Sequence, residues 1–378
     1  MFVRKIARLD ASRFSFTHPM KREALRLLRR LTEAHGPPGA EDDVRRIFAD
    51  EVKENVRCDR VGSIICDTTG GAAAPKVMVE AHMDEVGFVV QSITRDGYIR
   101  FSPLGGWWEH SLLSQRLRIR NRDGADIVGV VTAKPPHFLS RAERDKIVPL
   151  DRMFIDVGAT DANDVGGRFG IRIGDTIVPD STFTPMHDPD LLLAKAFDDR
   201  VGVALVIQLT RLLGGLKHPN RVFSVGTTQE EVGTRGARTA AFKVDPDVAV
   251  VLEGTPADDL PGALADEQQG AVGAGVQIRL MDPTALANRP LADFAADLAA
   301  ANGIPYQIAV RKSGGTNARA IHLHGAGVPT LVLGVPSRYI HTHNSVISIT
   351  DYLDTLKLLR LLLERLDKKI VAAFTDYR

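Results

Sequence analysis

The chain has 378 residues, which exceeds one ordinary domain, and its 44% hydrophobic and 25% charged residues are typical of a globular protein that folds in water. Its 48 basic and 47 acidic residues nearly cancel, and no polybasic block with interleaved aromatic residues occurs, which argues against nucleic acid or an acidic membrane as a partner. Cys58 and Cys66 are its two cysteines and lack a CxxC spacing, which argues against a disulfide framework and against a thiolate metal site.

The amino-terminal stretch MFVRKIARLDASRFSF mixes charged residues into its apolar positions. It therefore lacks the unbroken apolar core of a secretory signal, and no other stretch approaches the length of a membrane span. We expect a protein of the cytoplasm whose partner is small.

Helix and strand patterns follow in turn. From Met20 the stretch MKREALRLLRRLTEA places leucines on one face and basic residues elsewhere, and HGPPG stops it, which predicts an amphipathic helix. A second predicted helix begins at Ala40. The stretch KVMVEAHMDEVGF then predicts a short apolar strand that ends directly before His82 and Asp84.

The middle of the chain has a different pattern of apolar and polar residues. Between about Val86 and His187, short alternating runs such as GYIRFSP, QRLRIRN and DIVGVVT are punctuated by Asp-Gly pairs, which are typical of hairpin turns. Afterwards strand patterns such as RVFSVG, VAVVLEG and PTLVLGVP alternate with helical ones, including TNARAIHLHGAG. The sequence predicts an α/β domain, residues 1–86 and 187–378, interrupted by an inserted all-β domain, residues 87–186.

Metal-competent side chains follow four apolar strands of the predicted α/β domain. They are His82 and Asp84 after KVMVEA, Glu230 and Glu231 after RVFSVGTTQ, Glu253 after VAVVL, and His341 shortly after PTLVLGVPSRYI. In open parallel sheets ligands collect beyond the carboxyl ends of the strands, so we expect these side chains to converge. A fifth stretch, KAFDDRVGVAL, places Asp198 and Asp199 at the start of a predicted helix.

Each of these signals has an ordinary structural explanation when it is taken alone. An aspartate at a helix start is a good cap, a single histidine is more often packed in the core, and a Glu-Glu pair is usually solvated surface. Burying several carboxylates together is costly unless a cation neutralises them, so their number favours a metal site. Two divalent ions with one bridging carboxylate need about five such side chains, and the candidates are His82, Asp198, Glu231, Glu253 and His341.

Residues beside these candidate ligands have other interpretations. Glu230 adjoins a ligand, and we hypothesise that it is the general base that takes a proton from an activated water and delivers it to a leaving amine. His343 lies two residues from His341 and is its rival as a ligand. Arg338 and Lys312 lie near site motifs, and we interpret them as solvated surface residues.

Five ordered motifs carry a resemblance to a known family. The stretches AHMDEVGF, KAFDDRVG, TTQEEVGTRGA, GGTNARAIHLHGAGVPT and PSRYIHTH resemble the glutamyl aminopeptidase and tetrahedral aminopeptidase family, metallopeptidase family forty-two. The resemblance runs from about Pro19 to Leu366. It implies a two-metal exopeptidase that removes amino-terminal residues from peptides, with a zinc-exopeptidase-like domain interrupted by a barrel or PDZ-like domain used in subunit assembly.

The resemblance also implies a role for each candidate residue. Carried over, His82 and Glu253 would bind one metal, Glu231 and His341 the other, and Asp198 would bridge the two. Glu230 matches the family's general base, and Asp84 would orient His82 through its other ring nitrogen. The match at RYIH favours His341 over His343.

Two positions depart from the family pattern, which often has aspartate at both. The longer side chain of Glu253 still reaches a metal but bears on the metal preference. Asn317 lacks the negative charge of the family's aspartate, which bears on contacts with the substrate or with the metal ligands.

Zinc or cobalt suits a mixed imidazole and carboxylate site, and the resemblance implies a homo-oligomer, either a dimer or a twelve-subunit shell. Two other functions would keep the same ligands. One is a related two-metal deacylase or dipeptidase, and the length of the accepted substrate would distinguish it from an aminopeptidase. The other is a metal-stabilised assembly protein without turnover, in which Glu230 would have no function. The sequence does not fix the preferred amino-terminal residue.

Overall fold

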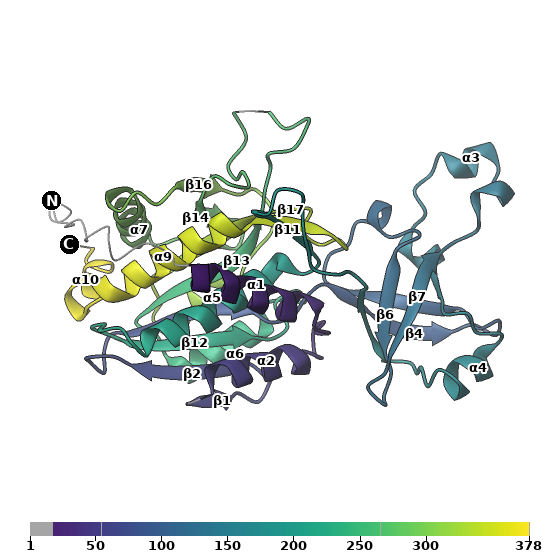
Figure 1. Ribbon diagram of the computed structural model, residues 1–378, viewed down its shortest axis with the longest axis horizontal. Helices are drawn as coiled ribbons and strands as arrows, with labels where there is room; N and C mark the ends of the chain where they lie inside the picture. The colour runs from purple at the N-terminus through teal and green to yellow at the C-terminus, as the bar shows by residue number, and fades with distance from the viewer. Residues whose placement is uncertain (1–17, 54, 265, 378) are drawn as a thin grey trace.

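The computed structural model describes residues 18–53, 55–264 and 266–377. Figure 1 shows a larger body, in which helices cover a sheet on both faces, and a smaller body of strands beside it. The predicted fold class, a mixed, mostly parallel sheet flanked by helices and interrupted by an all-β domain, is confirmed as a mixed sheet flanked by helices with an inserted antiparallel β-barrel. Parallel pairing is limited to the central strands and one outer pair, and the other strand pairs of the described sheet are antiparallel.

Within the described residues the large sheet has twelve strands, nine of them in the order β1-β2-β12-β3-β13-β17-β18-β11-β10, with β14 pairing β17 and carrying β15 and β16. Their bounds are β1 Val56–Cys58, β2 Ile64–Thr69, β3 Lys76–His82, β10 Thr184–Pro185, β11 Leu191–Ala194, β12 Arg221–Thr227, β13 Val248–Pro256, β14 Val276–Asp282, β15 Ala285–Leu286, β16 Tyr306–Val310, β17 Thr330–Arg338 and β18 Ser345–Ser348. The neighbours β12, β3, β13 and β17 run parallel, so their carboxyl ends lie at one edge of the sheet.

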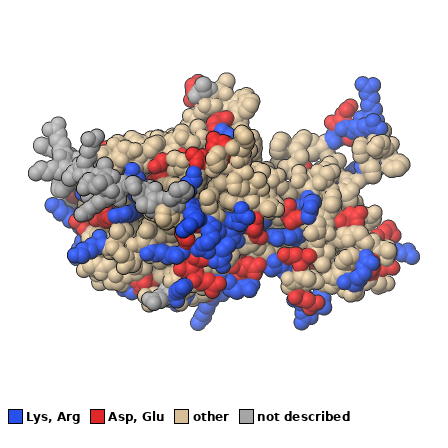
Figure 2. All heavy atoms as spheres, viewed as in Figure 1, with Lys and Arg blue, Asp and Glu red and all other residues tan. Residues whose placement is uncertain are grey.

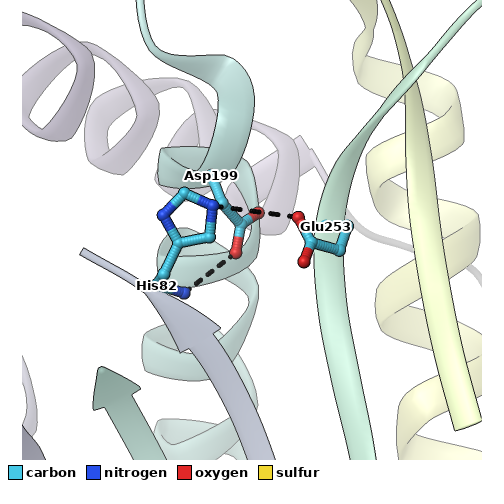
Figure 3. Close-up of side chains that lie close together, drawn as sticks. All are labelled: His82, Asp199 and Glu253. Carbon is cyan, nitrogen blue, oxygen red and sulfur yellow. Dashed lines mark hydrogen bonds and ion pairs between the residues drawn. The ribbon is translucent and has the colours of Figure 1, made fainter. Parts of the chain in front are cut away.

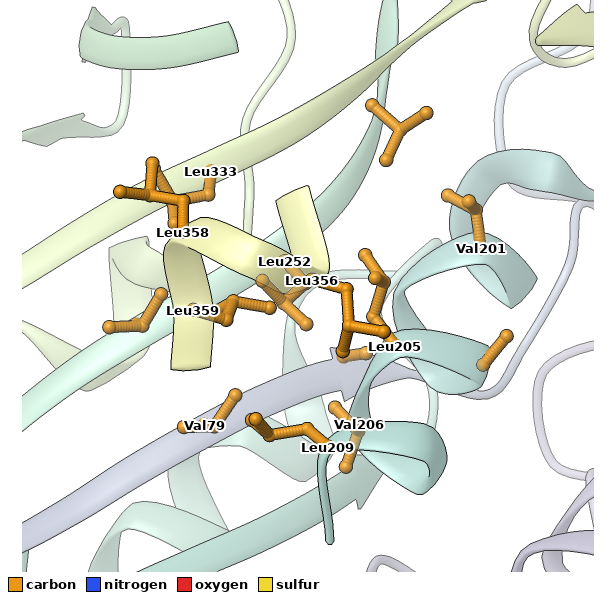
Figure 4. Packing of buried hydrophobic residues seen from close by; sticks show 14 of the residues in the cluster. Val79, Val201, Leu205, Val206, Leu209, Leu252, Leu333, Leu356, Leu358 and Leu359 are labelled. Carbon is orange, nitrogen blue, oxygen red and sulfur yellow. The ribbon is translucent and has the colours of Figure 1, made fainter. Parts of the chain in front are cut away.

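Helices cover the two faces of this sheet. Their bounds are α1 His18–Glu33, α2 Asp42–Val52, α5 Phe197–Leu213, α6 Arg235–Val244, α7 Arg289–Ala301, α8 Ala318–Ile321, α9 Ile349–Arg365 and α10 Lys368–Ala373. Successive strand residues point to opposite faces, so Leu252 packs in the core under α5 and α9 while Val251 packs under α6 and α8. Figure 4 shows the first core, where Leu205 of α5 and Leu356 of α9 lie close to Leu252.

The inserted strands close into a barrel in the order β4-β5-β8-β7-β6-β9. Their bounds are β4 Gly87–Ile93, β5 Ile99–Leu104, β6 Arg116–Arg120, β7 Asp126–Thr132, β8 Phe154–Asp156 and β9 Thr176–Pro179, and the insertion also holds α3 Arg141–Arg144 and α4 Ala162–Gly167. The two predicted hairpin turns are confirmed: Gly97 joins β4 to β5 and Gly124 joins β6 to β7, both with a positive φ that glycine adopts without strain. The division at residues 87–186 stays a prediction, and residues 1–17 lie outside the described residues.

Charged side chains of both signs are interspersed over the visible surface. Figure 2 shows a group of basic side chains over the region of α1, with acidic side chains beside it. Ion pairs join several of them, among them Arg26 with Glu51 and Arg211 with Glu23. Basic and acidic side chains therefore alternate on this face.

Two parts of the predicted chain order need correction. The helix predicted from TNARAIHLHGAG covers only Ala318–Ile321, because the chain turns at Gly325 and Gly327 with the positive φ that ends helices. The strands β14 and β16 were not predicted, and they extend the sheet beyond β17.

A buried ion cluster ties the start of α5 to the amino-terminal helices. Glu85 receives Lys195 and Arg200, and all three side chains are almost fully buried. Arg200 also donates to the carbonyls of Leu31 and Gly36, so it satisfies carbonyls just beyond and at the end of α1. The cluster therefore fixes the segment just after β3 and the start of α5, and these two segments carry candidate site residues.

Replacing Glu85 by glutamine is expected to lower the free energy of unfolding by about 3–5 kcal/mol, because it leaves two cations buried without a counter-charge. Urea unfolding followed by fluorescence measures the change. The control Glu23→Gln removes a carboxylate from an exposed ion pair and should cost less than about 1 kcal/mol. Equal losses in the two variants would contradict a structural role for the cluster.

Candidate metal centre

The parallel strands bring the predicted residues to one edge of the sheet. His82 ends β3 and Glu253 lies inside β13, while Glu230 and Glu231 follow β12 and His341 follows β17. Six of the seven predicted site residues line one cavity of about 350 Å³: His82, Asp198, Glu230, Glu231, Glu253 and His341. Asp84 is fully buried and is not among the residues that line the cavity.

Backbone carbonyls orient both histidines in the same way. The Nδ1 of His82 donates to the carbonyl of Asp84 over 2.9 Å, and the Nδ1 of His341 donates to the carbonyl of Gly106 over 3.0 Å. A neutral imidazole that donates from Nδ1 presents a free lone pair on Nε2. Both Nε2 atoms therefore face the carboxylates as potential ligands.

Asp198 lies between the two imidazoles. Its Oδ1 is 3.0 Å from His82 Nε2, and its Oδ2 is 3.4 Å from His341 Nε2. Glu231 Oε1 lies 3.3 Å from His341 Nε2, and Glu253 Oε2 lies 3.8 Å from His82 Nε2. Two atoms that bind one zinc ion at about 2.1 Å in tetrahedral geometry are roughly 3.4 Å apart, so these separations fit pairs of metal ligands.

The carboxylate of Asp84 connects two of the strand ends. Its oxygens accept the backbone N–H groups of Glu230 over 2.9 Å and Glu231 over 3.0 Å, while Oδ1 lies 3.5 Å from His82 Nδ1. The closer partner of that ring nitrogen is Asp84's own carbonyl. Asp84 thus positions His82 chiefly through its backbone and the Glu230-Glu231 pair through its side chain.

Asp199 is a further carboxylate near His82. The sequence analysis assigned it to the start of a helix and not to the candidate ligands. Figure 3 shows it reaching the backbone nitrogen of His82, a distance of 3.1 Å, while Glu253 faces the imidazole ring. Its other oxygen accepts the N–H of Gly202 over 3.0 Å. Within the described residues it forms a possible metal-binding group with His82 and Glu253, and a second group comprises His82, Asp198 and Glu231. Because both its oxygens accept backbone hydrogen bonds, we assign it to positioning.

His343, the rival of His341, lies elsewhere. It is buried, and its ring packs edge-on against Trp107 with centroids 5.7 Å apart. Burial lowers the pKa of His343 to about 4, which keeps it neutral. The structure therefore brings His341, and not His343, to the carboxylates.

Three buried acidic groups lie close together in the cluster. Burial raises the pKa values of Glu230, Glu231 and Glu253, that of Glu230 to about 8, and neighbouring carboxylates add to the rise. Burial acts to lower the pKa of His341, but the charge of Glu231 and contacts with Asp198 and Glu231 outweigh it and raise the value to about 11. The buried Oε1 atoms of Glu231 and Glu253 have no hydrogen-bond partner. Divalent cations would satisfy these oxygens, so the donor set fits them.

Sequence reasoning missed three basic residues of the cavity. Arg279, Arg311 and Arg319 line it, whereas Arg338 forms an ion pair with Asp259 and is not among the lining residues. Arg279 interrupts the apolar run VQIRLMD, and an arginine inside a buried strand was the signal available in the sequence. The inserted barrel also contributes, since Gly106 follows β5 and holds His341.

The fold and this buried set of imidazoles and carboxylates define a metal-dependent hydrolase as the class of protein. The chain belongs to the M42 glutamyl aminopeptidase family, whose sequence model matches residues 62–358. It is thus an aminopeptidase, a hydrolase of the metallopeptidase type. A second, short match to a family described as AMPT covers residues 22–48.

Similar proteins cover nearly the whole chain. The glutamyl aminopeptidase of Lactococcus lactis is 33% identical over 92% of this chain and 98% of its own, and the lysyl aminopeptidase of Pyrococcus furiosus is 34% identical over 90% and 96%. The TET aminopeptidase of Thaumarchaeota archaeon SCGC AB-539-E09 has 39% identity and a TM-score of 0.90 over 94% of this chain and 100% of its own. The TET1 peptidase of Pyrococcus horikoshii, which can assemble into a tetrahedron or a large octahedral shell, has 27% identity and a TM-score of 0.80 over 91% and 100%.

Proposed function

We propose that this aminopeptidase releases single residues from the free amino termini of short peptides, with two divalent metal ions per chain. The observation that carries the proposal is the position of Asp198, whose two oxygens face the two histidines at 3.0 and 3.4 Å. In the proposed site His82 and Glu253 would hold one ion, Glu231 and His341 would hold the other, and Asp198 would contribute to both. Bound ions would polarise the scissile carbonyl and lower the pKa of a coordinated water.

The chain's own residues have distinct tasks in this proposal. Glu230 lines the cavity beside Glu231 and has no role in the ligand set, so it is placed to take a proton from the attacking water and to return it to the leaving amine. Asp84 keeps this carboxylate in place by accepting the N–H of Glu230. The cavity is at the small end of ligand pockets, which commonly run from about 300 to 1,000 Å³, and so suits one end of a peptide.

A pair of matched peptides tests this proposal. With zinc or cobalt added, a short peptide with a free amino terminus should lose residues one at a time, as followed by mass spectrometry. The same peptide with an acetylated amino terminus should be cut at least about a hundredfold more slowly, because it lacks the charged amine that the carboxylates lining the cavity would bind. Equal rates would contradict exopeptidase action. Hydrolysis confined to dipeptides or acylated amino acids would favour the related deacylase or dipeptidase, and binding of metal without any turnover would favour an assembly protein.

Metal identity, assembly and compartment belong to the same proposal. Mixed nitrogen and oxygen ligands suit zinc or cobalt. The shell-forming Pyrococcus horikoshii relative supports a homo-oligomer, a dimer or a dodecamer, with the inserted barrel as the assembly domain. None of the helices in the described part of the chain has the length and apolar character to cross a membrane. The cytoplasm remains the expected compartment on the grounds of the sequence.

A further inference from the structure

The two candidate ligand histidines are supported differently. His82 is the last residue of β3, its side chain is 2% exposed, and its Nδ1 donates to the nearby carbonyl of Asp84. His341 lies beyond the end of β17, its side chain is 34% exposed, and its φ of 57° falls in the left-handed region that residues other than glycine seldom adopt. Such a conformation persists only where surrounding contacts hold it, so His341 depends on segments outside its own strand.

The segment Gly105–Trp107, which lies between the barrel strands β5 and β6, supplies such a contact. The carbonyl of Gly106 accepts the Nδ1–H of His341 over 3.0 Å. Gly105 lies directly against Glu231, because a Cβ atom added at this glycine would be 3.3 Å from Glu231 Cβ and 3.3 Å from its Oε2. One short segment therefore touches both residues that would hold one of the two ions.

Trp107 anchors this segment in the core of the barrel. Its indole stacks on the fully buried ring of Phe88, with centroids 4.6 Å apart, and its Nε1 donates to the carbonyl of Gly87 over 3.1 Å. The same indole packs edge-on against His343, two residues beyond His341. Trp107 thus joins the barrel core to the segment that carries His341.

Hydrogen bonds hold the barrel against the amino-terminal helices. Arg118 of β6 donates to the carbonyl of Glu33 at the end of α1 over 2.9 Å, and Arg120 of the same strand donates to Asp43 of α2 over 2.9 Å. These contacts fix the barrel relative to the α/β domain, and the segment Gly105–Trp107 is positioned with it.

The other proposed pair of ligands has its support within the sheet. His82 and Glu253 lie on the neighbouring central strands β3 and β13, and Glu253 pairs with Gly334 of β17. Both side chains are buried. A shift of the barrel segment is therefore expected to disturb Glu231 and His341 and to leave His82 and Glu253 in place.

We propose that the inserted barrel is part of the metal centre, and that Gly105 and Trp107 are its positioning residues. They hold Glu231 and His341 in place and so set the affinity for the ion that these two residues would bind, while the other ion is unaffected. Partners that orient metal ligands typically change metal affinity by about 10- to 100-fold although they do not touch the metal. The inference rests on the two-ion site of the proposed function and gives the barrel a role besides assembly.

Gly105→Ala tests the contact with Glu231. The added methyl group would lie 2.7 Å from Val86 Cγ1 as well as against Glu231, so these side chains must shift. Zinc titration of the chelator-stripped protein by calorimetry should show one of two sites weakened by at least about tenfold and the other changed by less than about twofold. In a protein that already carries His341→Ala, Gly105→Ala should not weaken the remaining site further, which assigns the effect to one ion.

Gly124→Ala is the matched control. Both glycines lie in the inserted domain with a positive φ, 89° at Gly105 and 80° at Gly124, so either substitution strains the backbone to a similar extent. A Cβ atom at Gly124 would meet nothing within 4 Å, and Gly124→Ala should leave both sites unchanged. The inference is overturned if Gly105→Ala weakens both sites equally or neither, or if Gly124→Ala has the same effect. A wild-type protein with fewer than two sites would overturn the proposed two-ion site, and this inference with it.

Substitutions of Trp107 test the anchor. Trp107→Ala removes the stack on Phe88 and should weaken the same single site by at least about tenfold. Trp107→Phe keeps an aromatic ring in contact with Phe88 and His343 and should recover most of that affinity. The neighbouring Trp108 is 64% exposed, so Trp108→Ala should leave both sites unchanged.

Urea unfolding of the metal-free proteins separates positioning from stability. A purely structural role of Trp107 would lower the free energy of unfolding and weaken both sites together, whereas positioning weakens one site in a protein that stays folded. If Trp107→Ala does not fold, Gly105→Ala still decides the question. Wild-type affinity at both sites in a folded Trp107→Ala would contradict the role of the anchor.

Discussion

Replacing Glu230 by glutamine is expected to lower kcat for a free peptide by about a thousandfold while the metal content per chain stays unchanged. The amide has nearly the same shape but accepts no proton, so proton transfer to and from the reacting groups is lost. The contacts that define the proposed ligand set do not include this side chain, since Asp198, Glu231 and Glu253 face the histidines. Steady-state kinetics and elemental analysis of the purified variant measure the two quantities.

A matched control separates this effect from a general loss of structure. Glu364→Gln changes the same residue type on α9, where the half-buried side chain pairs with Arg360 outside the candidate site, and it should keep full activity. If Glu230→Gln loses metal in proportion to activity, Glu230 is a ligand and the division of labour within the Glu230-Glu231 pair is wrong.

Removing the side chain of Asp198 is expected to abolish measurable activity and to weaken binding of both metal ions. Its two oxygens are the atoms that approach both imidazoles, so Asp198→Ala takes one ligand from each proposed ion. His341→Ala should weaken one ion only, because its contacts are with Asp198 and Glu231. Metal titration of the two variants by calorimetry distinguishes these patterns.

The control for this pair of variants lies on α7. Asp293→Ala removes an exposed carboxylate that pairs with Arg289, and metal binding should not change. A protein in which Asp198→Ala loses one ion and retains the other at wild-type affinity would contradict the bridging role.

The sequence was sufficient to predict the arrangement of the candidate ligands because strand ends are visible in it. Each apolar run gives way to a histidine or a carboxylate, and parallel strands must end at the same edge. The neighbours β12, β3, β13 and β17 satisfy that condition, which explains why residues as distant in the chain as His82 and His341 meet near Asp198.

Features that depend on contacts between distant segments could not be predicted from the sequence. The carbonyl of Gly106 orients His341 across the boundary between barrel and sheet, and no pattern marks a backbone carbonyl as a partner. Arg279 carried only the weak signal of a charge in a buried strand.

Asn317 shows how a departure from the family pattern is accommodated. Its amide donates to Glu80 over 2.7 Å and to the hydroxyl of Thr227 over 2.9 Å. Glu80 is fully buried, so a carboxylate at position 317 would place two acidic groups in contact. The amide of Asn317 supplies a hydrogen-bond donor instead of a second carboxylate, and Asn317 is buried and is not among the residues that line the cavity.

Metal titration of the stripped protein tests the central claim most directly. The protein is freed of metal with a chelator, zinc or cobalt is restored in steps, and metal per chain is measured together with cleavage of a free peptide. A two-metal site predicts no cleavage without metal and full activity as occupancy approaches two ions per chain. Full activity at one ion per chain, or cleavage that persists in the stripped protein, would contradict it.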